Sequence, residues 1–221
     1  MTIEISSSLM CADLLNLESE ILKLEKAGTD MFHMDIMDGH FVNNLALSID
    51  LLKAIRSVST TPLEAHLMVE NPLDYIEKAK KAGADTISVH LESTPHIHKA
   101  LKEVRECNMK AGIAINPGTS HLLIEPLLEE TDFILTMAVN PGFAGQEFIK
   151  STVNKVYKIN KMLEENNLTN IKIEVDGNIN SETIPPLYNA GARIFVGGTS
   201  GIFFGDRNYE RNIDNLKNSI K

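Results

Sequence analysis

The sequence has 221 residues, of which 43% are hydrophobic, and its formal net charge is −9 at pH 7. This length suffices for a complete core, so we expect residues 1–221 to form a single domain. The acidic balance disfavours nucleic acid and anionic membranes as partners, and no run of about 18 apolar residues suggests a membrane span. The first residues, MTIEISSSLM, do not resemble a secretory signal. Two cysteines, Cys11 and Cys107, form no disulfide framework, so we expect a cytoplasmic protein.

Short apolar runs alternate along the chain with longer segments of helical spacing. Strands are predicted, in chain order, at 3–8, 30–36, 62–68, 85–90, 110–115, 132–138, 171–176 and 193–197. Helices are predicted at 13–27, 48–57, 72–82, 96–107, 120–129, 148–165, 180–189 and 208–219. Eight such repeats favour a (β/α)₈ TIM barrel, an α/β fold whose active site lies at the carboxyl ends of the strands. An open doubly wound sheet is the alternative, disfavoured because no G-x-G-x-x-G fingerprint occurs.

Several boundary signals support this division into repeats. The tetrapeptides AGTD, AGAD and AGAR place Gly28, Gly83 and Gly191 where a helix ends before the next strand begins. In the segment ENPLDYI, Pro72 suits the start of a helix, and Asn71 is expected to cap its amino terminus.

Polar residues stand at the predicted carboxyl ends of three strands. The segment FHMDIMDGHFV supplies His33 and Asp35, PLEAHLMV supplies His66, and IKIEVDGN supplies Asp176. Singly, such residues usually serve packing or capping. Two carboxylates in one barrel mouth would repel each other unless a cation lay between them, and two imidazoles with two carboxylates suit a divalent transition metal. The sequence therefore predicts a metal site at this rim.

Other residues with inward parity belong to the same strands. Glu64 and Glu174 lie deeper, and we interpret them as an interior polar layer and not as ligands. Met37, Met68 and Met137 stand at strand ends near the predicted metal site. Methionine most often fills core space, but here the soft sulfurs could face the substrate and shield a developing anion without protonating it.

Glycine-rich stretches follow the last three predicted strands: NPGFAGQ (140–146), DGN (176–178) and GGTSG (197–201). Glycines let backbone N–H groups approach an anion closely, and the loops after strands seven and eight commonly bind phosphate in this fold. None of these loops contains Lys or Arg, and Arg193 lies away from the rim. Ordinary turns are the alternative interpretation. Backbone dipoles would let an acidic protein hold a phosphate group.

The chain resembles ribulose-phosphate 3-epimerases and the related allulose-6-phosphate 3-epimerases. The likeness extends over nearly the whole sequence, through SSSLMCADLLNL, FHMDIMDGHFV, HLMVENP, INPGT, AVNPGFAGQEF, IEVDG and GGTSGIF. The combination of H-x-D-x-M-D-G-H-F with P-G-F-x-G-Q is its most specific part. The resemblance implies a metal-dependent isomerase of ketose phosphates that uses one divalent ion, Zn, Fe, Mn or Co in preference to Mg. We also expect a homo-oligomer.

The same resemblance implies roles for individual residues. His33, Asp35, His66 and Asp176 would hold the metal, and Asp35 and Asp176 would double as the acid/base pair. Ser8 and His66 would contact the sugar. The residues implied to bind phosphate are Gly142, Phe143, Ala144, Gly145, Gly177, Asn178, Gly198, Thr199 and Ser200.

Some positions depart from the usual family pattern. Asn43 and Asn140 replace a proline and an acidic residue, and Asn178 stands where pentulose-phosphate enzymes carry a second glycine. The segments SLMC and GTSG resemble the allulose-6-phosphate branch. The sequence therefore favours D-allulose 6-phosphate, epimerised to D-fructose 6-phosphate, with D-ribulose 5-phosphate to D-xylulose 5-phosphate as the alternative.

Inverting C3 of a 2-ketose requires removal of a proton next to the carbonyl and return of one to the opposite face. A divalent cation on the C2 and C3 oxygens would stabilise the cis-enediolate. Strands one and eight separate strands two and seven, so Asp35 and Asp176 can flank the substrate from opposite sides. Two other hypotheses are a phosphosugar decarboxylase, which would need a strand-end lysine, and a non-catalytic phosphosugar-binding protein, which would be expected to have lost a ligand.

Overall fold

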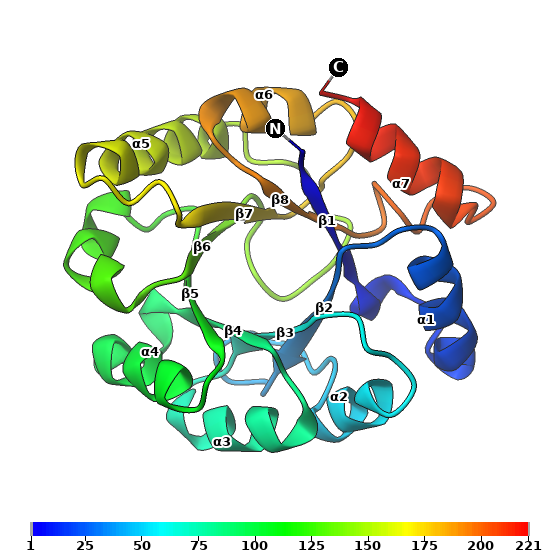
Figure 1. The fold of residues 1–221 in the computed structure, drawn as a ribbon, viewed down its shortest axis with the longest axis horizontal. Coiled ribbons are helices and arrows are strands. Elements are labelled where there is room, and N and C mark those ends of the chain that lie inside the picture. The colour runs from blue at the N-terminus through cyan, green and yellow to red at the C-terminus, as the bar shows by residue number, and fades with distance from the viewer. Residues whose placement is uncertain (1, 221) are drawn as a thin grey trace.

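The strands predicted from the sequence form a closed barrel. The computed structural model describes residues 2–220, in which eight parallel strands pair in sequence order and β8 pairs with β1. The strands are β1 (Glu4–Ser8), β2 (Met31–Met37), β3 (Leu63–Met68), β4 (Thr86–His90), β5 (Lys110–Ile115), β6 (Phe133–Met137), β7 (Lys172–Asp176) and β8 (Ile194–Gly197). Figure 1 shows them around the centre, inside a ring of helices. The predicted (β/α)₈ fold is confirmed.

Helices occupy the connections between successive strands, and one more helix follows β8. They are α1 (Leu17–Lys26), α2 (Ile49–Arg56), α3 (Leu73–Ala82), α4 (Ile97–Glu106), α5 (Ser151–Glu165), α6 (Ile184–Ala190) and α7 (Tyr209–Asn218). The helix predicted at 120–129 is the 3₁₀ helix η4 (His121–Glu130), and Pro126 lies inside it. Proline lacks an N–H and would clash with the preceding turn of an α-helix, which accounts for the different helix type.

The boundary predictions were right at the glycines and wrong at one cap. Gly28, Gly83 and Gly191 all have positive φ, at 84°, 101° and 121°, as expected at helix ends. Asn71 does not cap α3: Pro72 holds the cap position without a side-chain bond, and the Asn71 carbonyl accepts from the Asp74 N–H at 3.1 Å. The backbone of Asn71 therefore supplies the local bond that its side chain was expected to make.

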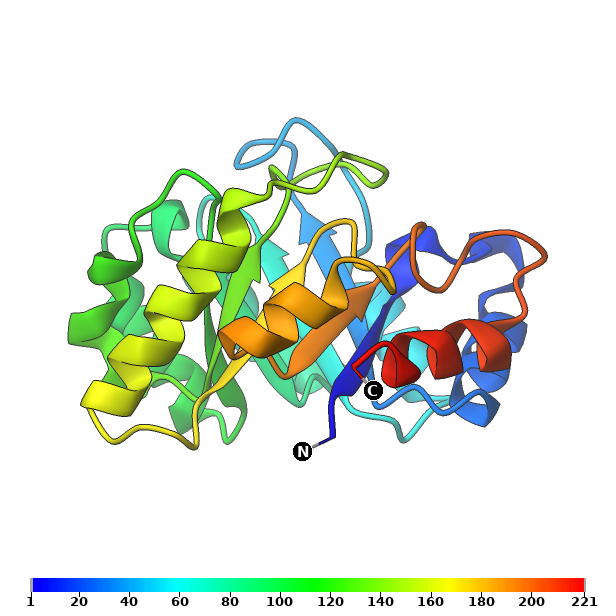
Figure 2. The ribbon, with the colours of Figure 1, turned by 90° about the horizontal axis from the view of Figure 1, so that it is seen from above.

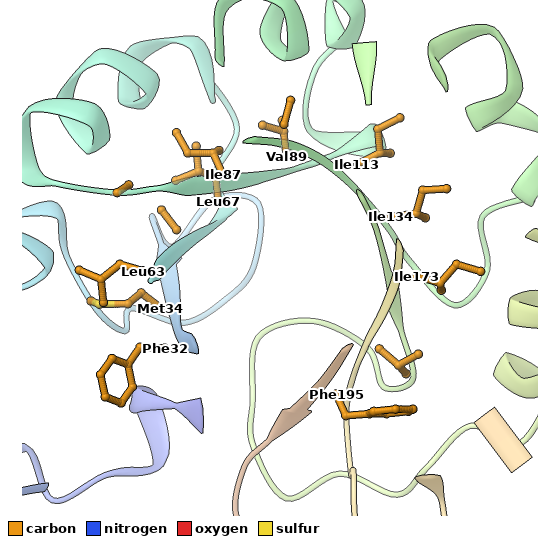
Figure 3. Packing of buried hydrophobic residues seen from close by; sticks show 14 of the residues in the cluster. Phe32, Met34, Leu63, Leu67, Ile87, Val89, Ile113, Ile134, Ile173 and Phe195 are labelled. Atoms are coloured by element: carbon orange, nitrogen blue, oxygen red, sulfur yellow. The ribbon is translucent and has the colours of Figure 1, made fainter. Parts of the chain in front are cut away.

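Outward-facing strand residues pack beneath the helices and form the main core. In Figure 3, side chains such as Phe32, Leu67, Ile113 and Phe195 point away from the barrel centre toward the surrounding helices. All four are fully buried. The alternation of a strand sends its other residues to the barrel interior, which is where the polar residues of the sequence patterns lie.

The strand register sets the height of those inward-facing residues. Asp35 on β2 pairs with His66 on β3, and Ser8 on β1 pairs with His33 on β2. Across the barrel, Asp176 is the last residue of β7. These positions bring polar residues of four strands, β1, β2, β3 and β7, to the carboxyl-terminal end of the barrel.

Two long loops rise above that end. Figure 2 shows the loop after β2 and the loop after β6 standing close together, on the opposite side of the barrel from the amino terminus. The Asn44 side-chain amide donates to the Gly142 carbonyl at 2.6 Å and joins the two loops. Within residues 2–220, no helix combines the length and the apolar character that crossing a membrane requires.

Candidate active site

Four side chains converge at the carboxyl ends of β2, β3 and β7. His33 Nε2 lies 3.2 Å from His66 Nδ1 and 3.9 Å from Asp176 Oδ2. Asp35 Oδ1 lies 3.2 Å from His66 Nδ1 and 3.3 Å from His33 Nε2. One ligand atom from each of the four residues lies within 4.8 Å of all the others. The structure thus brings together the whole ligand set predicted from the sequence.

The chemistry of this donor set fits a divalent transition metal. Two imidazole nitrogens and two carboxylate oxygens are ligands that Zn²⁺ and its neighbours accept. Both histidines are fully buried and Asp35 is 3% exposed, so most of the donors are already withdrawn from water. Carboxylates gathered in such a place are unfavourable unless a cation compensates their charge.

The electrostatics of His33 and Asp35 reflect their mutual contact. Burial alone would lower the pKa of His33, but the charges of Glu64 and Asp35 raise it well above its ordinary value. Burial alone would raise the pKa of Asp35, but the charge and hydrogen bond of His33, together with the adjacent His66 ring, hold it far below the usual range. Asp35 is therefore ionised at neutral pH.

The pKa of Asp176 is shifted in the opposite direction from that of Asp35. Burial raises the pKa of Asp176 to about 7, with the charges of Asp35 and Glu64 adding to the effect and His33 opposing it. Its side chain is 19% exposed, compared with 5% for Asp35. Two neighbouring carboxylates with different proton affinities can supply one acid and one base, and they titrate as a coupled pair.

The deeper glutamates form a buried layer below the cluster, as the sequence predicted. Glu64 Oε2 lies 3.1 Å from His33 Nδ1, and Glu64 Oε1 accepts from the Ser88 hydroxyl at 2.6 Å. Burial and the charge of Glu64 raise the pKa of Glu174 well above its ordinary value, which favours the neutral form of that carboxyl. His33, Glu64 and Glu174 also form a second group whose spacing could hold a metal ion.

Sequence reasoning missed two residues on the far side of His66. His90, the last residue of β4, places its Nε2 2.8 Å from His66 Nε2. Its Nδ1 lies 3.2 Å from Glu92 Oε2. Burial, the largest effect, lowers the pKa of His90 to about 4, so this ring is neutral at neutral pH. A histidine at the carboxyl end of a strand with inward parity was the signal that could have identified it.

A pocket opens above the four-residue cluster. It is lined by Asp35 and Asp176, and none of its lining residues is a lysine or arginine. Of the residues predicted to contact substrate, those that line it are Ser8, Met37, Met68, Met137, Gly142, Phe143, Ala144, Gly145, Gly177, Asn178, Gly198, Thr199 and Ser200. His66 is the exception, because it is fully buried beneath the pocket floor. Lining residues that were not predicted are Met10, Cys11, Val139, Asn140, Pro141, Gln146, Ile179 and Val196.

The loop after β6 is held in place by side-chain amides. Gln146 donates to the carbonyls of Asn140 and Phe143, at 2.6 and 2.8 Å. Asn178 donates to the Gln146 carbonyl at 2.9 Å and so ties the loop after β7 to the loop after β6. Phe143, which lines the pocket, is 54% exposed.

Asn178 has a left-handed backbone with φ of 50°. Glycine adopts this conformation freely, and asparagine is among the few other residues that tolerate it. The backbone and the bond to the Gln146 carbonyl together account for asparagine at this position. Its presence is therefore weak support for a particular substrate.

The fold and the site together define an enzyme barrel with a pocket above a cluster of four residues that could hold a metal ion. The model of the ribulose-phosphate 3 epimerase family matches residues 4–203. The chain belongs to this family, and it is a carbohydrate-phosphate epimerase.

Curated relatives cover almost the full length of the chain. The ribulose-phosphate 3-epimerase of Bacillus subtilis is 40% identical over 217 residues, which are 98% of this chain and 99% of that protein. The ribulose-phosphate 3-epimerase of Rhodobacter capsulatus is 42% identical over 205 residues, covering 92% and 87% of the two chains.

Solved structures with low sequence identity share the fold. The 3-keto-L-gulonate-6-phosphate decarboxylase of Vibrio cholerae O1 biovar El Tor aligns with a TM-score of 0.75 and 15% identity, over 100% of this chain and 98% of that chain. A mutant tryptophan synthase alpha-subunit from Pyrococcus furiosus aligns with a TM-score of 0.71 and 16% identity, over 97% of both chains. These alignments carry information on the fold alone.

Proposed function

We propose that this epimerase interconverts D-ribulose 5-phosphate and D-xylulose 5-phosphate. The observation that carries the proposal is the His33, Asp35, His66 and Asp176 cluster at the pocket floor of a chain in the ribulose-phosphate 3 epimerase family. The relatives described above are named ribulose-phosphate 3-epimerases. Their names favour the pentulose phosphate over the hexulose phosphate that the sequence segments had suggested.

The hexulose expectation rested on SLMC, GTSG and Asn178. The backbone conformation of Asn178 removes one of these three supports. Cys11 and Thr199, from the other two segments, do line the pocket. D-allulose 6-phosphate therefore stays the second candidate substrate, and the experiment below includes it.

The proposed chemistry is proton transfer at C3 by Asp35 and Asp176. Asp35, ionised and deeply placed on β2, takes a proton from one face, and Asp176 on β7, whose pKa is about 7, supplies one to the other face. For the reverse substrate the two carboxylates exchange roles. A divalent ion held by the cluster, of the Zn, Fe, Mn or Co type, would supply Lewis-acid stabilisation of the enediolate charge.

We further propose that the phosphate group is held by backbone N–H groups of the loops after β6, β7 and β8. The support is the absence of lysine and arginine from the pocket lining, together with Gly142, Gly177 and Gly198 in these loops. Oriented backbone N–H groups can bind an anion where side-chain cations are lacking. Met37, Met68 and Met137 would cover the reacting carbon with apolar surface.

The test is a comparison of kcat/KM for D-ribulose 5-phosphate and D-allulose 6-phosphate on the same metal-loaded preparation. We expect the pentulose phosphate to be preferred by at least about tenfold, or about 1.4 kcal/mol. A preference for D-allulose 6-phosphate would contradict this proposal and would support the hexulose phosphate as the substrate. Absence of turnover with either substrate would contradict both.

A further inference from the structure

The two nitrogens of His66 face different surroundings. Nδ1 points into the cluster, 3.2 Å from both Asp35 Oδ1 and His33 Nε2. Nε2 points the other way, 2.8 Å from His90 Nε2. A neutral imidazole carries one proton, so Nδ1 can offer a lone pair to a metal only when the proton is on Nε2. The ligand role of His66 therefore requires Nε2 to be the donor toward His90.

His90 must then accept at Nε2 and carry its own proton on Nδ1. That nitrogen lies 3.2 Å from Glu92 Oε2, and an ionised carboxylate only accepts. The hydrogen bonds of the three groups therefore run in one direction: His66 donates to His90, and His90 donates to Glu92. In the opposite direction, His66 would carry its proton on Nδ1 and present an N–H to the cluster.

Glu92 is fixed by its second oxygen. Glu92 Oε1 accepts from the Asn116 N–H at 2.9 Å and from the Thr119 hydroxyl, which join it to the segment after β5. The His90 ring is held between two others: its centroid lies 5.0 Å from that of His66 and 4.8 Å from that of Phe41. The geometry leaves neither group free to turn away.

We propose that His90 and Glu92 are positioning residues that set the tautomer of His66 and keep its Nδ1 available as a metal ligand. His33 is oriented more directly, because its Nδ1 lies 3.1 Å from the Glu64 carboxylate. For His66 the same task takes two hydrogen bonds, from His66 to His90 and from His90 to Glu92, which we call the His66 relay. Hydrogen-bonded partners of metal-binding histidines commonly contribute about 10–100-fold to metal affinity.

The decisive variant is Glu92→Gln. Because Oε1 receives two donors, the glutamine oxygen should stay at that position and the NH₂ group should replace Oε2. The amide then donates to His90 Nδ1, His90 donates through Nε2, and the His66 proton moves to Nδ1. Glu70→Gln is the matched control, since it removes the same charge from an exposed residue just beyond β3, outside the relay.

Two measurements on the full-length protein test the proposal without turnover. The first is ¹⁵N NMR of the histidine rings in metal-free protein, where we expect the proton of His66 on Nε2 in the original protein and on Nδ1 in Glu92→Gln. The second is Co²⁺ affinity, from chelator competition and the visible absorption of the bound ion. It should fall about 10–100-fold in Glu92→Gln and His90→Ala and less than about twofold in Glu70→Gln.

The proposal is overturned if Glu92→Gln leaves the His66 tautomer unchanged, or if its Co²⁺ affinity matches that of Glu70→Gln. It rests on the proposed metal site, and the two measurements separate the two ideas. A protein that binds no Co²⁺ would contradict the metal site. The NMR measurement of the His66 tautomer in the metal-free protein would then be the only test of the relay.

Discussion

The Ser8 hydroxyl donates to Asp35 Oδ2 at 2.9 Å, on the carboxylate oxygen that does not face the two histidines. Ser8 ends β1 and Asp35 lies on the adjacent β2, so the barrel register creates this contact. The bond fixes the carboxylate plane and leaves Oδ1 directed at the cluster. Ser8 thus holds the proposed base in one orientation.

Ser8→Ala should lower kcat by about ten- to a hundredfold, because a hydrogen bond to a charged group contributes about 1.5–3 kcal/mol. Metal content should change little, since Oδ1 keeps its surroundings. Steady-state kinetics and elemental analysis measure the two effects. Ser6→Ala is the matched control: the buried Ser6 hydroxyl has no hydrogen-bond partner among residues 2–220, so its removal should leave kcat nearly unchanged.

Metal removal should abolish turnover. Two groups of possible metal ligands occur among the described residues. Only the four-residue cluster reaches the pocket, through Asp35 and Asp176. Extensive chelation should therefore remove both the metal and the activity, and added Zn²⁺, Mn²⁺ or Co²⁺ should restore them. His66→Ala should lose the metal itself. Full activity with no metal detectable by elemental analysis would contradict the metal site.

Asp35→Asn and Asp176→Asn should each abolish interconversion in both directions. Loss of general acid–base catalysis alone costs about 10²–10⁴-fold, and each change also removes a proposed ligand. Product formed in D₂O should carry deuterium at C3, because the returning proton comes from a second carboxyl group that exchanges with solvent. Retention of the original hydrogen, with one aspartate dispensable, would instead indicate a single base.

Gly198→Val should raise KM strongly and lower kcat less. A Cβ at this position would lie 3.3 Å from Cys11 Sγ, in a pocket where we propose that N–H groups bind phosphate. Gly118→Val is the control, since a Cβ there meets nothing within 4 Å. If neutralising a lysine or arginine outside the pocket raised KM more than Gly198→Val, the backbone account of phosphate binding would be wrong.

The stability contributed by Glu92 should depend on pH between about 2 and 4.5. Burial would raise the pKa of Glu92, but hydrogen bonds from His90, Thr119 and Asn116 lower it from 4.5 to about 2. A lowered pKa means that the unfolded chain binds more protons, so this contribution is present above pH 4.5 and lost as pH falls toward 2. For a partly exposed group we expect about 1–2 kcal/mol.

Urea unfolding of the metal-free protein and of Glu92→Gln at several pH values measures this contribution. The difference in unfolding free energy should be largest near neutral pH and should shrink as the pH is lowered from about 4.5. A difference independent of pH would show that the Glu92 charge does not stabilise the fold.

The sequence by itself determined the order of the strands and helices and the four residues of the proposed metal site. These features depend on local periodicity and on which side chains stand at strand ends. They can be predicted without knowledge of the contacts, because the parallel strands of a barrel all end on the same side. The inward parity of His33, Asp35, His66 and Asp176 was therefore sufficient to bring them together.

Only the tertiary structure decided what surrounds those four residues. The relay from His66 through His90 to Glu92 depends on the pairing of β3 with β4 and on a loop after β5, which no local pattern specifies. The burial of His66 beneath the pocket and the different pKa shifts of Asp35 and Asp176 also come from distant neighbours. Desolvation and charge interactions act through space, so they are fixed only when the barrel closes.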